Sequence, residues 1–365
     1  MKSGRIRMGV SGLGRVGWPF HCAESARHPE FEFVAVQDPE QTRREEAERV
    51  YGVCTFKSFS DMLGECRLDA VAIATPTHLH RAMTMEALRA GCHVMLEKPM
   101  TPGSADAAVI VREATRRKRI LTVYQPRRAV AYFQHLRALI ASGIIGDIYH
   151  VRIGLFQFTM RNDWQALRKF GGGMLNNYGA HALDQLLQLV GYDVKRLFCS
   201  LRLVASVGDA EDVVKIVLET AGGRIGEVDI NQASATNPYF LDVWGSRGCI
   251  TLPPADIGRF TVRHIAARTV RPKKLEPALA SAGRKYPDGD VPFRESLIPV
   301  DESLGVDVYA DFARAIRTGR EPFVRPEEPL ALMRLIDRCR AQSGRIVKTP
   351  LYSPSKAPQG KRSGA

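Results

Sequence analysis

A glycine-rich turn near the N-terminus constrains the fold more than any other feature of this chain. Residues 5–11 read as a short buried strand, residues 12–17 follow at once, and a predicted helix extends to Ala26. In such a unit the first glycine of G-x-G-x-x-G makes the tight turn, the second lets a pyrophosphate approach the backbone, and the third lets the helix pack on the strand. The helix N-terminus favours phosphates. The predicted dinucleotide site therefore comprises Gly12, Leu13, Gly14, Arg15, Val16 and Gly17.

Strands and helices alternate over about 125 residues. Further strands are expected at 31–36, 70–74, 92–96 and 120–124, with helices at 42–51, 78–90 and 104–117. This alternation predicts an α/β fold in which a doubly wound parallel sheet carries helices on both faces. Residues 1–126 are therefore predicted to form an NAD(P)-binding Rossmann domain.

The pattern changes after this region, and residues 127–349 are predicted to form a second, α+β domain. A strand over 148–158 and five more between 197 and 252 suit a mostly antiparallel sheet. Helices are expected at 131–142, 174–190, 306–318 and 329–343, and a long loop at 268–300. Residues 350–365, rich in Ser, Pro, Lys and Gly, are predicted to be a disordered tail.

Composition excludes several classes of function. The net charge is +13, from 52 basic and 39 acidic residues, but the basic residues are scattered without interleaved aromatic residues. We therefore expect a solvated basic surface that favours an anionic substrate, and no nucleic acid partner. No run approaches the ~18 apolar residues of a membrane span, and the N-terminus shows no secretion signal. The seven cysteines form no C-x-x-C pair, so we expect reduced thiols, no metal site and a cytoplasmic protein.

Three segments follow strands at the edge where a doubly wound sheet binds ligands. Asp38 comes 21 residues after Gly17, and its carboxylate can accept hydrogen bonds from ribose hydroxyls and repel a 2′-phosphate. NAD is therefore favoured, although Arg43 and Arg44 can be either an exposed helix face or a phosphate clamp, which leaves NADP open. Thr75 and Pro76 should border the cofactor, and His78 and His80 are read as cofactor-loop or surface histidines.

Glu97-Lys98-Pro99 ends a strand at the same edge. A lysine that is partly desolvated beside NAD⁺ has a lowered pKa, which suits proton transfer. Farther along, a helix is expected to begin near Met174, with Asn177, His181 and Asp184 on one face. Taken alone, that helix is more typical of a hydrogen-bonded structural histidine and a surface acid than of a catalytic site.

Together, the N-terminal G-x-G-x-x-G, Glu97-Lys98-Pro99 and the glycine-rich run that leads to His181-x-x-Asp184 resemble the glucose–fructose oxidoreductase / inositol dehydrogenase family, Gfo/Idh/MocA. The resemblance covers residues 5–345. It implies a Rossmann domain followed by a domain with a large open sheet, through which members commonly associate, here as a homo-dimer or homo-tetramer. It also implies hydride transfer between a nicotinamide cofactor and a hydroxyl or keto group of a sugar, cyclitol or sugar derivative.

By this resemblance Lys98 and His181 match the catalytic lysine and histidine, and Thr75, Pro76, His80, Glu97 and Gln125 match positions that line the cofactor. Many members carry Asp where this chain has Asn177, which cannot take up a proton but can hydrogen-bond a substrate hydroxyl. Proximity to the glycine run adds Arg161, Trp164 and Tyr178 as substrate-pocket candidates.

The resemblance also allows two other functions. Some relatives cleave glycosidic bonds with tightly held NAD⁺, and some bind the cofactor as non-catalytic regulators. Retention of both Lys98 and His181 argues against the regulator. In the leading hypothesis His181 removes the hydroxyl proton and Lys98 steadies the charge on the same oxygen, or the two exchange roles.

Overall fold

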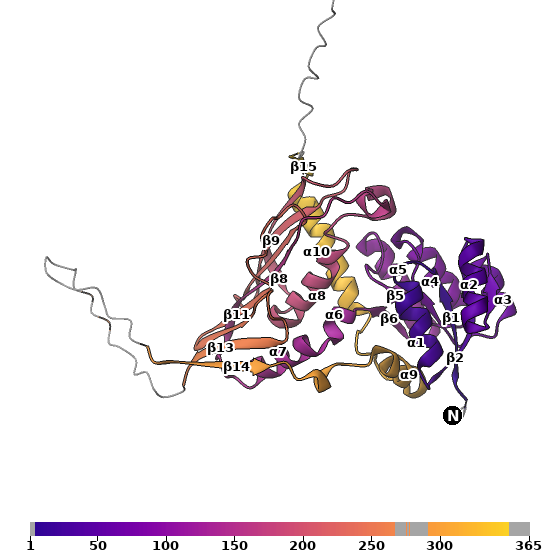
Figure 1. Cartoon of the computed structure of the whole chain (residues 1–365), viewed down its shortest axis with the longest axis horizontal. Helices are drawn as coiled ribbons and strands as arrows, with labels where there is room; N and C mark the ends of the chain where they lie inside the picture. The colour runs from indigo at the N-terminus through magenta and orange to yellow at the C-terminus, as the bar shows by residue number, and fades with distance from the viewer. Residues whose placement is uncertain (1–3, 267–274, 276, 278–290, 350–365) are drawn as a thin grey trace, which may run out of the picture.

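The computed structural model describes residues 4–266, 275, 277 and 291–349. The tail predicted at 350–365, and the part of the predicted loop that covers 268–274, 276 and 278–290, lie outside the described residues. No helix in the described ranges is long and apolar enough to cross a membrane. The chain is built on two sheets, each with helices packed against it (Figure 1).

The first sheet is parallel throughout, and its strand order is β3-β2-β1-β4-β5-β6. This is the order of a doubly wound dinucleotide-binding sheet, so the fold predicted for this part is confirmed. Its central strands are fully buried because helices cover both faces. The strands are β1 (Ile6–Ser11), β2 (Phe31–Gln37), β3 (Cys54–Phe56), β4 (Ala70–Ile73), β5 (His93–Glu97) and β6 (Leu121–Tyr124).

The helices of this part connect successive strands. The helix after the glycine turn opens as a π-helix over Gly17–Cys22 and continues as α1 (Ala23–Arg27). α2 ends at Gly52, whose φ of +65° suits a glycine after a helix. The remaining helices are α2 (Gln41–Tyr51), α3 (Phe59–Glu65), η2 (Thr77–Leu79), α4 (His80–Arg89) and α5 (Ser104–Arg117).

The second sheet has nine strands in the order β14-β13-β12-β11-β7-β10-β9-β8-β15. All its pairs are antiparallel except β7 with β10 and β8 with β15, which confirms the predicted large, mostly antiparallel sheet. Burial alternates along β9, so one face points to the core. The strands are β7 (Ile148–Phe156), β8 (Val194–Leu203), β9 (Val213–Thr220), β10 (Ile225–Asn231), β11 (Leu241–Gly245), β12 (Gly248–Leu252), β13 (Arg259–Ile265), β14 (Phe293–Pro299) and β15 (Val347–Lys348).

Helices cover the core face of the second sheet. α8 packs on β7 and β10, and α10 packs on β8 and also on α5 of the first part, so α10 joins the two halves (Figure 1). The helices of this part are α6 (Pro126–Ala129), α7 (Ala131–Ala141), η3 (Trp164–Ala166), η4 (Arg168–Phe170), α8 (Tyr178–Val190), η5 (Glu302–Leu304), α9 (Val308–Thr318) and α10 (Glu327–Ser343).

Two features differ from the sequence-based expectations. β14 lies inside the segment predicted as a loop, and that prediction is wrong there, because six of its seven residues are exposed and leave no apolar alternation to read. The hydrogen-bond ladder to β13 holds it instead. In addition, α9 returns to the first sheet, where Tyr309 packs 5.6 Å from the Phe31 ring. The division at residue 126 stays a prediction.

Candidate active site

The glycine-rich turn links β1 to the first helix, and two of its glycines are required sterically. Gly12 has a φ of +88°, and a Cβ there would lie 2.6 Å from the Ala74 carbonyl oxygen. A Cβ on Gly17 would lie 1.7 Å from the Gly12 carbonyl oxygen. Gly14 differs, because nothing lies within 4 Å of the position of its Cβ. Its backbone borders an open cleft, which fits the close approach of a pyrophosphate.

Asp38 follows β2 and is tied to the same turn. Its Oδ2 accepts a hydrogen bond from the Leu13 N–H at 2.8 Å, and its Oδ1 accepts one from the Glu40 N–H at 2.9 Å. Arg43 approaches to 3.4 Å, so a carboxylate and a guanidinium stand together at this end of the cleft. Arg44 instead donates to the backbone oxygens of Asp38 and Pro39.

The cleft, of roughly 900 Å³, follows the carboxyl edge of the first sheet. Most of the predicted cofactor residues line it, together with the predicted catalytic lysine and two further predicted substrate residues. These lining residues are Gly12, Gly14, Arg15, Val16, Asp38, Thr75, Pro76, Glu97, Lys98, Trp164 and Asn177. The other predicted residues are not part of the wall: Leu13, Gly17, His80, Gln125, Arg161, Tyr178 and His181.

His80 shows why a predicted cofactor residue can lie behind the wall. Its side chain is buried, with Nε2 2.9 Å from the Thr75 carbonyl oxygen and Nδ1 3.0 Å from that of Pro99. The ring therefore braces the two turns that face the cleft. Gln125 is also buried, and its Nε2 donates to the Ala180 carbonyl oxygen at 3.4 Å.

Lys98 points across the cleft from the first part of the chain to the second. Its Nζ donates to the Asn177 Oδ1 at 3.0 Å and to the Asn177 carbonyl oxygen at 3.3 Å. Burial lowers the pKa of the Lys98 ammonium, and the positive charges of Arg127 and Arg161 lower it further, against the opposing effect of Glu97. A lysine in this setting can give up or share a proton more readily than a surface lysine.

Glu97 holds the backbone of Lys98 in place. Its Oε2 accepts the Lys98 backbone N–H at 3.0 Å, and its Oε1 lies 3.0 Å from the His21 Nε2. The His21 Nδ1 in turn lies 2.7 Å from the Tyr309 hydroxyl. All three partners are buried, so α9, far along the chain, helps to fix the Glu97-Lys98-Pro99 turn.

The helix that carries His181 begins at Tyr178, four residues later than expected. Gly171 and Gly173 have φ values of +78° and +103°, which a helix does not allow. The next two residues are then held in a non-helical turn by hydrogen bonds to Glu211. Its carbonyl oxygen accepts the Met174 N–H and its Oε1 the Leu175 N–H. Asn177 therefore precedes the helix and turns its amide to Lys98 and to Gln165.

His181 is buried close to Lys98. Within the described part of the chain, its Nδ1 has no hydrogen-bond partner. Burial, followed by the charges of Lys98 and Arg127, lowers the pKa of His181 well below its usual range. The imidazole is therefore neutral near pH 7 and can accept a proton.

One family model, an oxidoreductase family with an NAD-binding Rossmann fold, matches residues 6–125, and a second, the GFO/IDH/MocA C-terminal domain, matches residues 133–251. The chain belongs to the Gfo/Idh/MocA family. It is accordingly an NAD(P)-binding protein of an oxidoreductase family, as predicted.

Relatives of this Gfo/Idh/MocA chain include sugar and cyclitol dehydrogenases. It is 27% identical to D-glucoside 3-dehydrogenase of Escherichia coli, over 66% of this chain and 67% of the relative. It is also 27% identical to myo-inositol 2-dehydrogenase of Thermotoga maritima, over 67% of this chain and 74% of the relative. The fold matches the WlbA dehydrogenase of Bordetella pertussis, solved with NADH and UDP-GlcNAcA, with a TM-score of 0.75, 23% identity and coverage of 93% and 97%.

Asp184, three residues after His181 on α8, is held by other partners in this Gfo/Idh/MocA fold. It is 1% exposed and forms a two-pronged ion pair with Arg128, which is equally buried and also binds Glu328 at 2.6 Å. Burial opposes the charge on Arg128, but the two carboxylates outweigh it and raise the pKa of the guanidinium. Asp184 thus links α8, α6 and α10 and does not extend the predicted site.

Sequence reasoning missed part of the wall around Trp164. Asp163 accepts a hydrogen bond from Arg15 at 2.7 Å, which connects the glycine turn to the second part of the chain. Gln165 receives the Asn177 amide at 3.2 Å, and the predicted substrate residue Arg161 donates to Asp163 at 3.2 Å. One signal in the sequence could have indicated this turn, because an aspartate often caps the start of a helical turn. In the structure the Asp163 side chain accepts the Gln165 N–H and caps η3.

Proposed function

We propose that the protein is an NAD(P)-dependent oxidoreductase that transfers hydride between the cofactor and a CH–OH or keto group of a sugar, cyclitol or sugar derivative. One observation carries the proposal. Lys98 and Asn177, from the two halves of the chain, meet through a 3.0 Å hydrogen bond in the same cleft that the glycine turn borders. A polyhydroxylated ring held there would contact Lys98, and the buried His181 lies close to that lysine.

The proposed chemistry is divided between His181 and Lys98, two neighbouring residues. His181, neutral because of its lowered pKa, accepts the proton of the substrate hydroxyl. The Lys98 ammonium donates a hydrogen bond to the same oxygen and stabilises its developing negative charge, or exchanges roles with His181. Asn177 donates or accepts a hydrogen bond at a neighbouring hydroxyl. A nicotinamide cofactor held in the cleft would supply the hydride acceptor.

The residues around the glycine turn suit either nicotinamide dinucleotide, with NAD favoured. We expect Asp38→Asn, which keeps an acceptor for the Leu13 N–H, to shift the ratio of kcat/KM for NADP⁺ over NAD⁺ upward by about tenfold, because it removes a like charge from the 2′-phosphate position. Steady-state kinetics with both cofactors measures this ratio. Asp147→Asn, an exposed aspartate elsewhere, is the control. An unchanged ratio would exclude the ribose role of Asp38.

The pH dependence of the reaction follows from the buried site. The pKa of His181 lies well below 6.5 and that of Lys98 below 10.5. The basic form of His181 therefore persists as the pH falls, and the acid limb of kcat/KM should lie below pH 6.5, with any alkaline limb below 10.5. A pH–rate profile of the free enzyme measures both limbs. An acid limb at or above pH 6.5 would contradict His181 as the base.

The substrate class is tested by following the reduced cofactor near ~340 nm, where its dihydronicotinamide ring absorbs. NAD⁺ and NADP⁺ are supplied against inositols, aldoses, sugar acids and glycosides. Growth of the signal with one class identifies the reaction and the substrate. Cleavage of glycosides without net reduced cofactor would favour an NAD-dependent glycosidase, and tight cofactor binding with no turnover would favour a regulator.

We further propose that the protein forms a homo-dimer or homo-tetramer through its second sheet. Large side chains are exposed on strands of this sheet, among them Tyr149 on β7, Phe198 on β8 and Leu297 on β14, which are 51%, 52% and 60% exposed. Association would remove them from water. Light scattering measures the oligomeric mass.

A further inference from the structure

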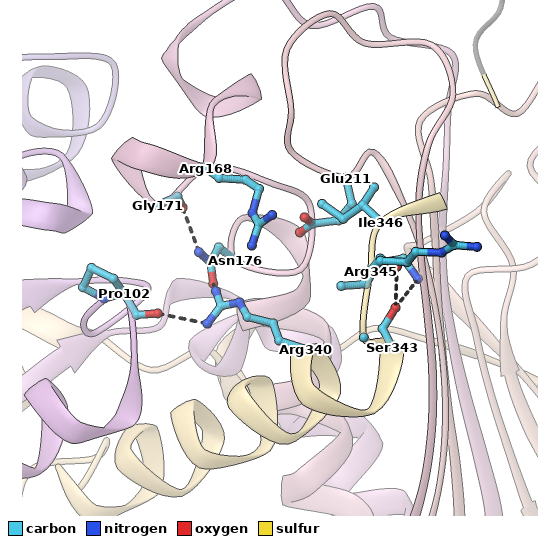
Figure 2. Close-up of a pocket in the computed structure, with 12 residues that line it drawn as sticks. Pro102, Arg168, Gly171, Asn176, Glu211, Arg340, Ser343, Arg345 and Ile346 are labelled. Carbon is cyan, nitrogen blue, oxygen red and sulfur yellow. Dashed lines mark hydrogen bonds between the residues drawn. The ribbon is translucent and has the colours of Figure 1, made fainter. Parts of the chain in front are cut away.

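A second, smaller pocket shares a wall with the cleft (Figure 2). Both are bordered by Gly171, Gly172 and Asn176, but the smaller pocket opens toward the end of α10 and the start of β15. Its volume is about 180 Å³. At ~30 Å³ for each water of the liquid, this is the space of about six waters, enough for a small polyatomic ion.

Two guanidinium groups and one carboxylate face this pocket from segments far apart in the sequence. Figure 2 shows the side chains of Arg168, Arg340 and Glu211 converging on it. Arg340 is fixed by the Pro102 carbonyl oxygen at 3.0 Å, by the Asp337 carboxylate at 3.1 Å and by the Asn176 Oδ1. The Arg168 guanidinium, in contrast, forms no hydrogen bond or ion pair with any described residue.

Glu211 is a rigid part of the pocket. Its side chain is only 7% exposed, its Oε1 accepts the Leu175 N–H at 3.0 Å, and a Cβ on Gly173 would lie 2.3 Å from that oxygen. Burial raises the pKa of Glu211, while Arg340 and Arg168 oppose the shift and favour the carboxylate. A fixed carboxylate beside a free guanidinium calls for a ligand that carries both anionic oxygens and a donor hydroxyl.

We propose that this pocket binds hydrogen phosphate, or the phosphate group of a small monoester in its singly protonated form. Arg168 and Arg340 donate to the anionic oxygens, since guanidinium matches phosphate in shape and charge. Glu211 accepts a hydrogen bond from the P–OH group. Sulfate has the same shape but no proton near neutral pH, so its oxygens meet the carboxylate without a hydrogen bond between them, and the pocket selects phosphate over sulfate.

Titration calorimetry on the full chain tests this site. The protein is first saturated with NAD⁺, which occupies the other phosphate-binding turn, and is then titrated with inorganic phosphate or sulfate at constant ionic strength. We expect one phosphate per chain and sulfate binding weaker by about tenfold or more, the effect of one charged hydrogen bond. Glu211→Gln should bring the two affinities together.

Two arginine variants provide a matched comparison. Arg168→Ala should weaken phosphate binding by about tenfold, because it removes the unpaired guanidinium. Arg345→Ala removes the same charge from the same rim, but its guanidinium points away from the pocket in Figure 2, so phosphate affinity should stay within about twofold.

Three results would overturn the proposal: no phosphate binding to the NAD⁺-saturated protein, equal affinity for sulfate, or equal losses in Arg168→Ala and Arg345→Ala. The Arg168 variant decides the matter even if Glu211→Gln does not fold, since the Arg168 side chain is exposed and makes no bond to a described residue. The readout is heat of binding, so the result is independent of the substrate and of turnover.

Discussion

Lys98→Ala should lower kcat by about 10²- to 10⁴-fold while it leaves NAD⁺ affinity nearly unchanged, the range typical of a removed acid–base group. The physical reason is the environment of the ammonium. It is desolvated, its pKa is lowered, and it reaches across the cleft to Asn177 at 3.0 Å. With the substrate that the screen identifies, kcat is measured from the absorbance of the reduced cofactor near ~340 nm. The affinity for NAD⁺ is measured by calorimetric titration.

Two controls separate this effect from a general loss of structure. Lys195→Ala removes the same charge from an exposed position on β8 and should leave kcat within about twofold, as expected of a surface substitution. The unfolding midpoint of Lys98→Ala is measured beside it, because Asn177 loses a hydrogen-bond partner. Full turnover in a folded Lys98→Ala protein would remove Lys98 from the mechanism.

The parts of the fold that followed from the sequence are those in which local pattern and packing agree. Ala70–Ile73 is apolar at every position and is a fully buried central strand, and Gly12 and Gly17 occupy places where a side chain cannot fit. β14 did not follow, because its side chains are exposed and only the ladder to β13 holds it. A pattern of hydrophobic residues cannot report a strand that buries almost none.

The candidate site divides in the same way. Lys98 and Asn177 come from two segments that were both predicted to contribute to the active site, and the structure brings the two residues into contact. The sequence could not show that His80 braces the wall from behind, since burial depends on Pro99 and Thr75, which the fold places around it. The second pocket was equally invisible. Arg168, Glu211 and Arg340 lie far apart in the sequence and share no motif, and only the fold brings them to one pocket.

Asp184, on the same helix as His181, gives a sharp test of stability. In the structure it neutralises Arg128, which is 1% exposed, so Asp184→Ala leaves a buried guanidinium with Glu328 as its remaining carboxylate partner. Breaking one side of a buried ion pair costs about 3–5 kcal/mol, and we expect the free energy of unfolding to fall by about 3 kcal/mol.

Urea unfolding of Asp184→Ala measures this cost, and a variant that breaks an exposed ion pair is the matched control. Glu219→Ala removes the carboxylate that meets Arg196 at 3.1 Å on the surface, where the side chains are 39% and 84% exposed, and should change the unfolding free energy by less than ~1 kcal/mol. Equal changes in the two variants would mean that the Arg128 cluster contributes no more than a surface pair. A large loss confined to Asp184→Ala would mean that the acid of the His-x-x-Asp motif holds α8 against α6 and α10, and so places His181 without touching the substrate.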